Sequence, residues 1–274
     1  MGGRRRQTQP DPPAHRCADR VAVAFDVDGT LFDSEPEGHR VAFNAAFAEL
    51  GVDVQWDLDT YANLLAVPGG RRRIEHYLIC CGTGLQDARD TAVRVHERKT
   101  ELIVELALAG RIPTRPGVEQ LVRQLLDAGA ELHVVTTGSA RWVRPLLTAT
   151  FGVGTFDIVI TAEDVLELKP SPEAYLHVLQ GSGLDPRHVV AIEDSAVGLA
   201  SARAAGLTCL VVRDSYAGHG PFPGAALICS GFEELTAEIV LGAMPCRARR
   251  STAVRPEFDR ALIPARRDGD LDDR

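Results

Sequence analysis

The apolar positions begin with one short buried strand. Residues 21–25 read VAVAF, a run of apolar side chains that is typical of a strand buried on both faces in a parallel sheet. The run stops at the polar segment DVDGTLFDSE, residues 26–35. From residue 36 onward apolar side chains recur at helical spacing, and glycine-rich breaks at 67–70 and 81–84 divide them. Since no comparable strand appears before residue 131, residues 36–112 are predicted to form an all-helical unit.

Strand-like and helix-like patterns alternate after residue 112. Strands are predicted at 131–136, 156–160, 188–192, 208–212 and 225–229, and helices at 117–127, 140–150, 172–181 and 196–205. This alternation predicts an α/β fold, in which helices cover both sides of a doubly wound parallel sheet. Residues 21–35 and 113–240 are expected to form this core domain, and residues 36–112 a small helical cap domain inserted after the first strand.

The two ends of the chain lack hydrophobic periodicity. Residues 1–20 and 241–274 are rich in Pro, Arg and Asp, so we expect disordered tails with no assigned role. The basic N-terminus is followed by no apolar segment, which argues against a secretory signal. No run approaches the roughly 18 apolar residues of a membrane-spanning helix. We therefore expect a cytoplasmic protein that does not bind membranes.

Charge and cysteine content narrow the partners further. The net charge is −8 over 274 residues, and the arginines gathered at both ends leave the central part more acidic than the whole. An acidic surface repels phosphate backbones, so nucleic acid is not expected as a partner. The six cysteines form no metal-ligand spacing and are expected to be reduced. Only two of the 30 basic residues are lysines, Lys99 and Lys169, which makes the position of each informative. A monomer that acts on a small molecule is the expectation.

Polar side chains follow the predicted strands, at the sheet edge where ligands bind in such folds. Taken singly, each has an ordinary explanation as an acidic turn, a helix cap or a solvated lysine. Taken together, they predict a magnesium ion held by acidic side chains, with a hydroxyl group and a lysine opposite, around a phosphoryl group. In chain order these residues are Asp26, Asp28, Thr136, Thr137, Lys169, Glu193 and Asp194.

Four segments at these strand ends resemble the motifs of the haloacid dehalogenase (HAD) superfamily. They are FDVDGT, VVTTGS, LKPSPEAY and AIEDSAVGLASARAAG, and the resemblance covers residues 21 to about 235. It implies a Rossmannoid core with a helical cap of the C1 type, an essential Mg²⁺ and an aspartyl-phosphate intermediate. The dehalogenase branch of the superfamily is disfavoured, because those enzymes need neither the second acid nor the metal, whereas this chain keeps Asp28 and the acids at 193–194.

The resemblance also implies a role for each motif residue. Asp26 would be the nucleophile, and Asp28 would protonate the leaving oxygen and then activate water. Thr136 and the Thr137 amide would bind phosphoryl oxygens, and Lys169 would neutralise charge in the transition state. Asp26, Asp28 and Asp194 would hold the metal, with Glu193 bound directly or through water.

The cap carries a closer resemblance, to the CbbY-type phosphatases, which act on the sugar bisphosphate xylulose-1,5-bisphosphate. The segments that carry it are 37–51, 61–78 and 96–118. Arg71 and Arg73 would hold the second phosphate, although three consecutive arginines are also typical of a solvated helix start. Relatives typically have Lys at position 71 and an acid at position 72, so this segment is more cationic than the pattern. Glu35 and His39 are further expected substrate contacts, and His39, Arg40 and Asn44 either line the cleft or form a polar helix face.

Three other functions remain open at this point. A sugar phosphomutase of the β-phosphoglucomutase kind shares all four motifs. A phosphoglycolate-type phosphatase is a further alternative. A non-catalytic regulator that binds phosphorylated metabolites would keep the same pocket, but the complete set of acids and lysine argues against it.

Overall fold

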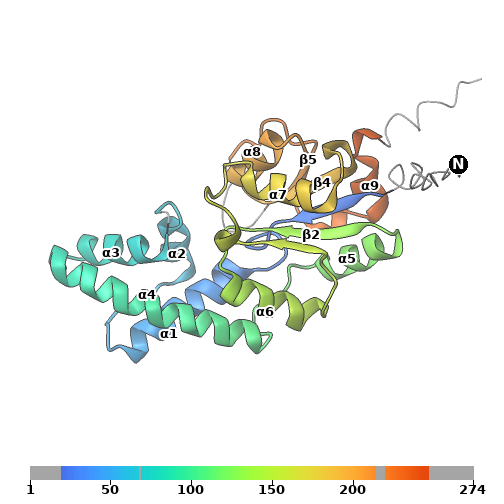
Figure 1. The fold of residues 1–274 in the computed structure, drawn as a ribbon. Helices are drawn as coiled ribbons and strands as arrows, with labels where there is room; N and C mark the ends of the chain where they lie inside the picture. Colours follow the sequence, from blue (N-terminus) through green and yellow to red (C-terminus); the bar gives the residue numbers. More distant parts are fainter. Residues whose placement is uncertain (1–19, 68, 214–219, 247–274) are drawn as a thin grey trace, which may run out of the picture.

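A six-stranded parallel sheet forms the core of the protein. The computed structural model describes residues 20–67, 69–213 and 220–246. The strands lie in the order β3-β2-β1-β4-β5-β6, with all neighbours parallel (Figure 1). Their bounds are β1 Ala22–Phe25, β2 Glu131–Val135, β3 Ile158–Ile160, β4 Val189–Glu193, β5 Thr208–Val212 and β6 Leu227–Cys229.

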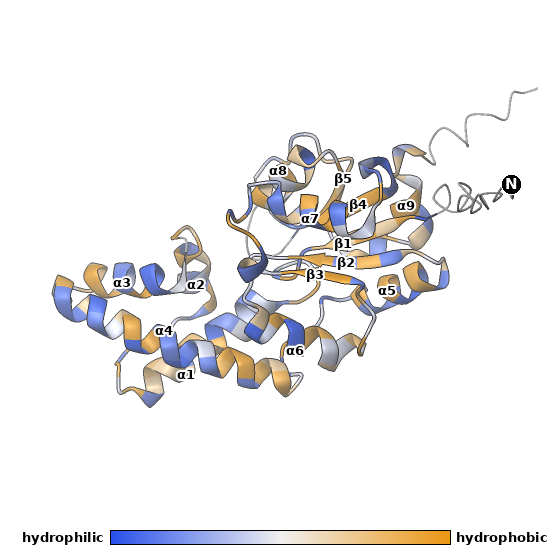
Figure 2. Ribbon diagram, viewed as in Figure 1, coloured by the Kyte–Doolittle hydropathy of each residue, from blue (hydrophilic) through white to orange (hydrophobic). Residues whose placement is uncertain are grey.

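Helices cover both faces of this sheet, which confirms the predicted α/β class. In β1, Val23 and Phe25 face one apolar cluster while Ala22 and Ala24 face the other, so this strand is apolar throughout (Figure 2). The first cluster is covered by α5 (Val118–Asp127), α6 (Ala140–Phe151) and α9 (Ala237–Gly242), and the second by α7 (Glu173–Ser182) and α8 (Ala196–Ala204). Short 3-10 turns lie at Ala162–Asp164, Pro186–His188 and Phe232–Glu234.

All regular elements between β1 and α5 are helical. A π-helical turn at Glu35–His39 leads into α1 (Arg40–Glu49), followed by α2 (Leu58–Leu64), α3 (Gly70–Cys80) and α4 (Leu85–Leu108). These helices enclose their own apolar cluster, which contains Phe43, Phe47, Trp56 and Tyr61. The long helix α4 also reaches back to the core, where it packs along α6 (Figure 1). This cap is therefore a unit with its own core that remains joined to the sheet domain.

The two connections between cap and core run side by side. The Asp33 amide donates to the Pro113 carbonyl at 3.1 Å, and the Arg115 amide donates to the Leu31 carbonyl at 3.1 Å. The pair of segments leaves the core directly beside the end of β1. Any movement of the cap therefore starts next to the acidic turn.

The folded part extends beyond the expected bounds at both ends. Arg20, which we assigned to a tail, donates two hydrogen bonds to Glu131 at 2.5 and 2.8 Å. Leu241 and Met244 were also assigned to a tail, but both are buried because α9 packs on the sheet. The rest of the expected tails lies outside the described residues. No helix in the described part of the chain is long and apolar enough to cross a membrane.

The predicted strand at 156–160 begins later than expected. Asp157 lies just before β3 and pairs with Leu132 of β2 through its amide, at 2.7 Å, and through its carboxylate, which accepts from the Leu132 amide at 3.1 Å. The edge strand β6 is likewise shorter than the apolar run 225–229. The other strand and helix bounds agree with the predictions to within one or two residues.

Candidate active site

The ends of β1, β2 and β4 meet around the side chain of Lys169. Its ammonium group donates to Asp26 Oδ1 at 2.6 Å, to Glu193 Oε1 at 2.7 Å and to the Val135 carbonyl at 2.7 Å. The Lys169 side chain is 5% exposed and Glu193 is fully buried. This one buried cation thus joins Asp26, 143 positions before it in the chain, to Glu193, 24 positions after it. Sequence reasoning placed all three residues in the same site, and the structure brings them together.

Burial and neighbouring charges together set the protonation of Asp26 and Lys169. Burial raises the pKa of Asp26 to about 7, although the positive charge of Lys169 works in the opposite direction. Burial alone would lower the pKa of Lys169, but Asp26 and Glu193 outweigh it and raise that pKa. The lysine therefore stays charged, and a further cation beside Asp26 would favour its ionised form.

Glu193 has a more specific place than the sequence indicated. Its Oε1 atom accepts hydrogen bonds from Lys169 and from the Tyr175 hydroxyl, while Oε2 is buried with no partner among the described residues. A Cβ atom at Gly198 would lie 1.8 Å from Oε2, so only glycine leaves room for this carboxylate. One oxygen of Glu193 thus orients the lysine, and the other is left to accept a further ligand.

Three acidic side chains at this edge could share a cation. Ligand oxygens of Asp26, Glu193 and Asp194 all lie within 4.8 Å of one another, and all three residues are buried. The expected ligand Asp28 does not contribute its carboxylate to this cluster. Contrary to the prediction, the Asp28 side chain is therefore not a ligand of this cluster, because the acidic turn directs the side chains of Asp26 and Asp28 differently.

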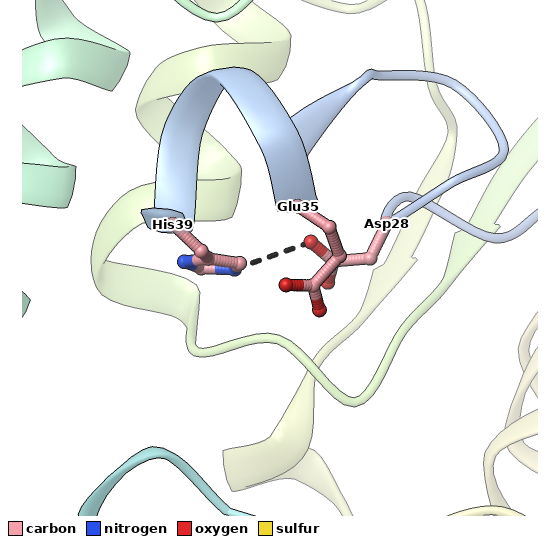
Figure 3. A group of neighbouring side chains, drawn as sticks. All are labelled: Asp28, Glu35 and His39. Atoms are coloured by element: carbon pink, nitrogen blue, oxygen red, sulfur yellow. Dashed lines mark ion pairs between the residues drawn. The ribbon is translucent and has the colours of Figure 1, made fainter. Parts of the chain in front are cut away.

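The carboxylate of Asp28 points toward the cap. It accepts a hydrogen bond from the Ser34 hydroxyl at 2.5 Å, and its Oδ1 atom lies 3.3 Å from Nε2 of His39 (Figure 3). Burial would raise the pKa of Asp28, but the hydrogen bonds from His39 and Ser34, together with the charge on Lys99, lower it. Glu35 lies beside this pair, and the three side chains Asp28, Glu35 and His39 form a second group of possible ligand atoms within 4.8 Å.

The two threonines after β2 differ in their burial. Thr136 is buried, and its Oγ1 accepts a hydrogen bond from the Gly138 amide at 2.9 Å, which leaves the hydroxyl proton for another acceptor. Thr137 is exposed and lines the cavity described next, together with Gly138 and Ser139. Ser139 caps α6 and donates to Glu163, so its hydroxyl is already engaged.

A cavity of about 400 Å³ lies between the core and the cap. Asp28 and Thr137 line it from the core, and Glu35 and His39 line it from the π-helical turn. The cap contributes two buried cations, Arg73 and Lys99, and the remaining lining residues are Phe43, Gly69, Gly70, His96, Thr100, Ile103, Gly138, Ser139 and Trp142. The cavity therefore has acidic groups at its core end and positive charge at its cap end.

Lys99 is the main cavity residue to which no role was assigned from the sequence. Its ammonium lies 2.8 Å from Nδ1 of His39, and because an ammonium can only donate, Nδ1 accepts and Nε2 carries the proton toward Asp28. Burial lowers the pKa of Lys99 to about 8. A signal for it exists in the chain, since Lys99 occupies one place in the buried stripe of α4, which otherwise consists of Ala88, Ala92, Val95, Ile103 and Ala107.

The three consecutive arginines separate on α3. Arg73 is buried, donating Nε to the Leu64 carbonyl at 3.0 Å and Nη1 to the Tyr61 hydroxyl at 3.0 Å, and that hydroxyl in turn donates to Glu35. Arg71 and Arg72 are exposed and line a second cavity, which meets the first at Gly69, Gly70 and His96. Arg71 and Arg73 therefore line different cavities.

Two other polar residues of the cap serve its structure. Asn44 exchanges hydrogen bonds with the Trp56 backbone, with both donor–acceptor distances at 2.8 Å, and Arg40 donates to the Trp56 and Pro36 carbonyls. Of the two interpretations of this helix face, the cavity contact holds for His39 alone. Within the described residues five cysteines are free, and Cys17 lies outside them.

Comparisons with known proteins agree with this geometry. The family model of haloacid dehalogenase-like hydrolases matches residues 21–206. Protein CbbY of Cereibacter sphaeroides is 40% identical over 221 residues, which cover 78% of this chain and 93% of that protein. The CBBY-like protein of Arabidopsis thaliana is 38% identical, and the match spans 74% of this chain and 66% of that protein.

Solved structures point to the same relatives. The crystal structure of a CbbY variant from Rhodobacter sphaeroides in complex with xylulose-1,5-bisphosphate has a TM-score of 0.65 and 37% identity, covering 79% of this chain and 96% of that one. A complex of the Rhodobacter sphaeroides protein with phosphate gives a TM-score of 0.65 and 38% identity over the same shares. The chain therefore belongs to the haloacid dehalogenase-like hydrolases, and within them it is a CbbY-like phosphatase.

Proposed function

We propose that this phosphatase is Mg²⁺-dependent, forms a phosphoenzyme on Asp26, and hydrolyses a pentulose bisphosphate such as xylulose-1,5-bisphosphate. The observation that carries the proposal is the distribution of charge over the strand ends and the cavity beside Asp28. Acidic groups and Lys169 meet at the strand ends, and the buried cations Lys99 and Arg73 line the cavity from the cap. A substrate with two phosphates suits this distribution, because a buried cation is available to each phosphate.

The acidic cluster has the chemistry of a magnesium site. Mg²⁺ prefers carboxylate oxygens and few protein ligands, and Asp26, Glu193 and Asp194 offer three carboxylates within reach of one another. The buried Oε2 atom of Glu193 lacks any described partner, as expected for an atom that accepts a ligand from outside the chain. When bound there, the ion would neutralise the phosphate charge and polarise its oxygens.

The side chains around Asp26 support a two-step transfer. A carboxylate oxygen of Asp26 attacks phosphorus, the bond from phosphorus to the sugar oxygen breaks, and that oxygen takes a proton from Asp28. Water then attacks the phosphoryl group and gives a proton to Asp28, and the bond to Asp26 breaks. Lys169, at 2.6 Å from Asp26, and the free hydroxyl proton of Thr136 stabilise negative charge on the transferring group.

Asp28 suits both halves of this sequence. Its lowered pKa keeps it ionised for the attack of water. A dianionic phosphate placed beside it raises the pKa again by charge repulsion, which favours the protonated acid in the first step. Ser34 and the protonated Nε2 of His39 hold the carboxylate in place during both steps.

On the cap side of the cavity we assign the second phosphate to Lys99 and Arg73, in place of the pair Arg71 and Arg73. Lys99 uses one of its three protons on His39 and retains two for a phosphate. Arg73 is fixed by Leu64 and Tyr61, so its guanidinium is already oriented. The complex of the Rhodobacter sphaeroides relative with xylulose-1,5-bisphosphate supports the choice of a ketopentose bisphosphate.

A mutase is the second candidate function. A protein described as a putative β-phosphoglucomutase from Thermotoga maritima shares the fold with a TM-score of 0.61 and 26% identity. The similarity to a predicted phosphoglycolate phosphatase, at 21% identity, concerns the fold alone. Phosphatase and mutase differ in whether water or a sugar hydroxyl takes the phosphoryl group from Asp26. Phosphate release and isomerised sugar, measured in parallel, separate them.

The proposal is tested with matched bisphosphate and monophosphate substrates in the presence of Mg²⁺. Arg73→Ala should lower kcat/KM on the bisphosphate by about tenfold to a hundredfold, the loss of one charge-assisted hydrogen bond. The loss on the monophosphate should be small. Arg71→Ala is the control, because Arg71 lies on the same helix but lines the outer cavity. Equal losses on both substrates would refute the assignment of a second phosphate to this end.

A further inference from the structure

Arg115 is a buried cation next to the acidic turn, and no role has been assigned to it above. We infer that Arg115 is a positioning residue for phosphoryl transfer: its guanidinium fixes the turn that carries Asp28, so that Asp28 can protonate the leaving oxygen. The inference rests on the proposed function in one respect, the use of Asp28 as the acid.

The contacts of Arg115 join two strand ends that are far apart in the chain. Nη1 donates to the Gly29 carbonyl at 2.6 Å and to the Val212 carbonyl at 3.3 Å. Nη2 donates to the Arg213 carbonyl at 2.6 Å. Gly29 directly follows Asp28, and Val212 is the last residue of β5. The guanidinium therefore ties the turn after β1 to the end of β5, two strands away in the sheet.

This arrangement adds little to stability, but it fixes the positions of the two segments that it joins. Arg115 is only 8% exposed, and its one ion pair in the described part of the chain is with Asp33, at 4.0 Å. Removing a guanidinium from water costs several kcal/mol, and carbonyl groups at this distance recover only part of it. The planar fork does provide two donor nitrogens with fixed geometry, which hold two segments at once. A lysine has one nitrogen and cannot reproduce this.

Backbone bonds within the turn that Arg115 holds restrain it as well, since the Thr30 and Phe32 amides both donate to the Val27 carbonyl, at 3.3 and 3.1 Å. Gly29 has a φ of 72°, and its amide donates to the Phe32 carbonyl at 3.0 Å. From the cap side, Ser34 and His39 hold the Asp28 carboxylate. Arg115 thus adds a connection from this turn to the end of β5, against which those two contacts orient the acid. Without it the turn can shift, and a shift on the order of 1 Å in a reacting group costs about a hundredfold in rate.

A defect in an acid has a kinetic signature that a defect in stability lacks. Protonation of the leaving oxygen matters for a sugar alkoxide and hardly at all for 4-nitrophenolate, which leaves without a proton. The parameter kcat/KM includes the steps up to departure of the leaving group, so the later attack of water does not enter it. The ratio of kcat/KM for a sugar phosphate to that for 4-nitrophenyl phosphate therefore falls when the acid is impaired and does not change when only stability is lost.

The experiment compares this ratio in four variants of the full chain. Arg115→Lys keeps the charge and Arg115→Gln keeps one donor group, and Asp28→Asn defines the effect of losing the acid. Arg144→Lys is the matched control, because Arg144 also donates to a strand carbonyl, that of Val159 in β3 at 3.0 Å. Circular dichroism and thermal unfolding of each variant establish that it folds.

We expect Asp28→Asn to lower the ratio by about a hundredfold or more, the usual contribution of a general acid. Both Arg115 variants should lower it by at least about tenfold, and Arg144→Lys should leave it unchanged. Equal losses on the two substrates, no loss, or failure of both Arg115 variants to fold would each overturn the positioning role. An unchanged ratio in Asp28→Asn would instead overturn the acid role of Asp28, and with it the inference.

Discussion

Replacement of Lys169 by methionine tests how the buried charges of the site depend on one another. Methionine keeps most of the volume of the side chain and removes the ammonium group, which donates to Asp26, Glu193 and a backbone carbonyl at 2.6 to 2.7 Å. Two buried carboxylates then remain without their cation. Breaking a buried ion pair in this way costs about 3–5 kcal/mol. We expect the free energy of unfolding to fall by that amount at pH 8 without added metal, and turnover to be lost.

The cost should depend on pH with a defined sign. Burial raises the pKa of Asp26 to about 7 in the folded protein, compared with 3.8 in an unfolded chain, and removing Lys169 raises the folded value further. Below the folded pKa, Asp26 takes up a proton and no longer needs the lysine. The destabilisation by Lys169→Met should therefore be larger at pH 8 than at pH 5.

Denaturation with urea at both pH values measures the effect, and the slope of the transition shows whether the unfolded state is comparable. Adding Glu193→Gln to Lys169→Met removes one of the two carboxylate charges that no longer have a cation beside them. The double variant should be more stable than the sum of the single effects predicts, by about 1 kcal/mol or more. A cost below about 1 kcal/mol, or equal costs at the two pH values, would contradict the coupling of these charges.

Four further outcomes follow from the site and the core. Asp26→Asn should abolish phosphate release because an amide cannot form the phosphoenzyme, and a variant that retains a tenth of the activity contradicts this. Chelation should remove activity, with recovery on added Mg²⁺ but not on Ca²⁺, whose coordination is larger and looser; full activity in excess chelator is the contrary result. Gly198→Ala, which places a Cβ 1.8 Å from Glu193 Oε2, should cost about 1–3 kcal/mol and activity, whereas Gly84→Ala, with its nearest neighbour at 3.8 Å, should cost little in thermal unfolding. Both ring nitrogens of buried His133 lack a partner among the described residues, and burial lowers its pKa below the usual 6.5. The free energy of unfolding in urea should therefore fall as the pH drops below about 6.5, and it should depend less on pH in His133→Leu. Parallel pH curves for the two proteins would argue against this role of His133.

The local pattern of the chain was sufficient to predict the helices and strands and the polar residues near the strand ends. Strand β1 is apolar at every position because both of its faces are buried, and that property is visible in the sequence as VAVAF. Asp26, Thr136 and Glu193 each stand at a strand end along the chain, and Lys169 lies in the segment between β3 and α7. The parallel topology alone brings such residues to one edge, so their proximity could be predicted without knowledge of side-chain directions.

Side-chain direction was the first feature that required the tertiary structure. Asp26 and Asp28 look equivalent in the sequence, but the turn sends the first toward Lys169 and the second toward the cap. The bonds that hold Asp28 come from Ser34 and His39, and the latter is fixed in turn by Lys99, 60 residues further along the chain. Such a chain of contacts has no local signature, because each link depends on how the cap packs.

The parallel sheet, the helical cap and the groups at the strand ends could be predicted from the chain alone, because each depends on periodicity or on position next to a strand. Which cations of the cap reach the cavity depends instead on how the helices pack in three dimensions. Arg71 and Arg73 are two residues apart on α3, which separates them by about 200° around the helix, so burial of Arg73 leaves Arg71 outside. Lys99 has its place in the apolar stripe of α4, which is visible in the sequence, but packing between the helices decides that this stripe borders the cavity as well as the core of the cap.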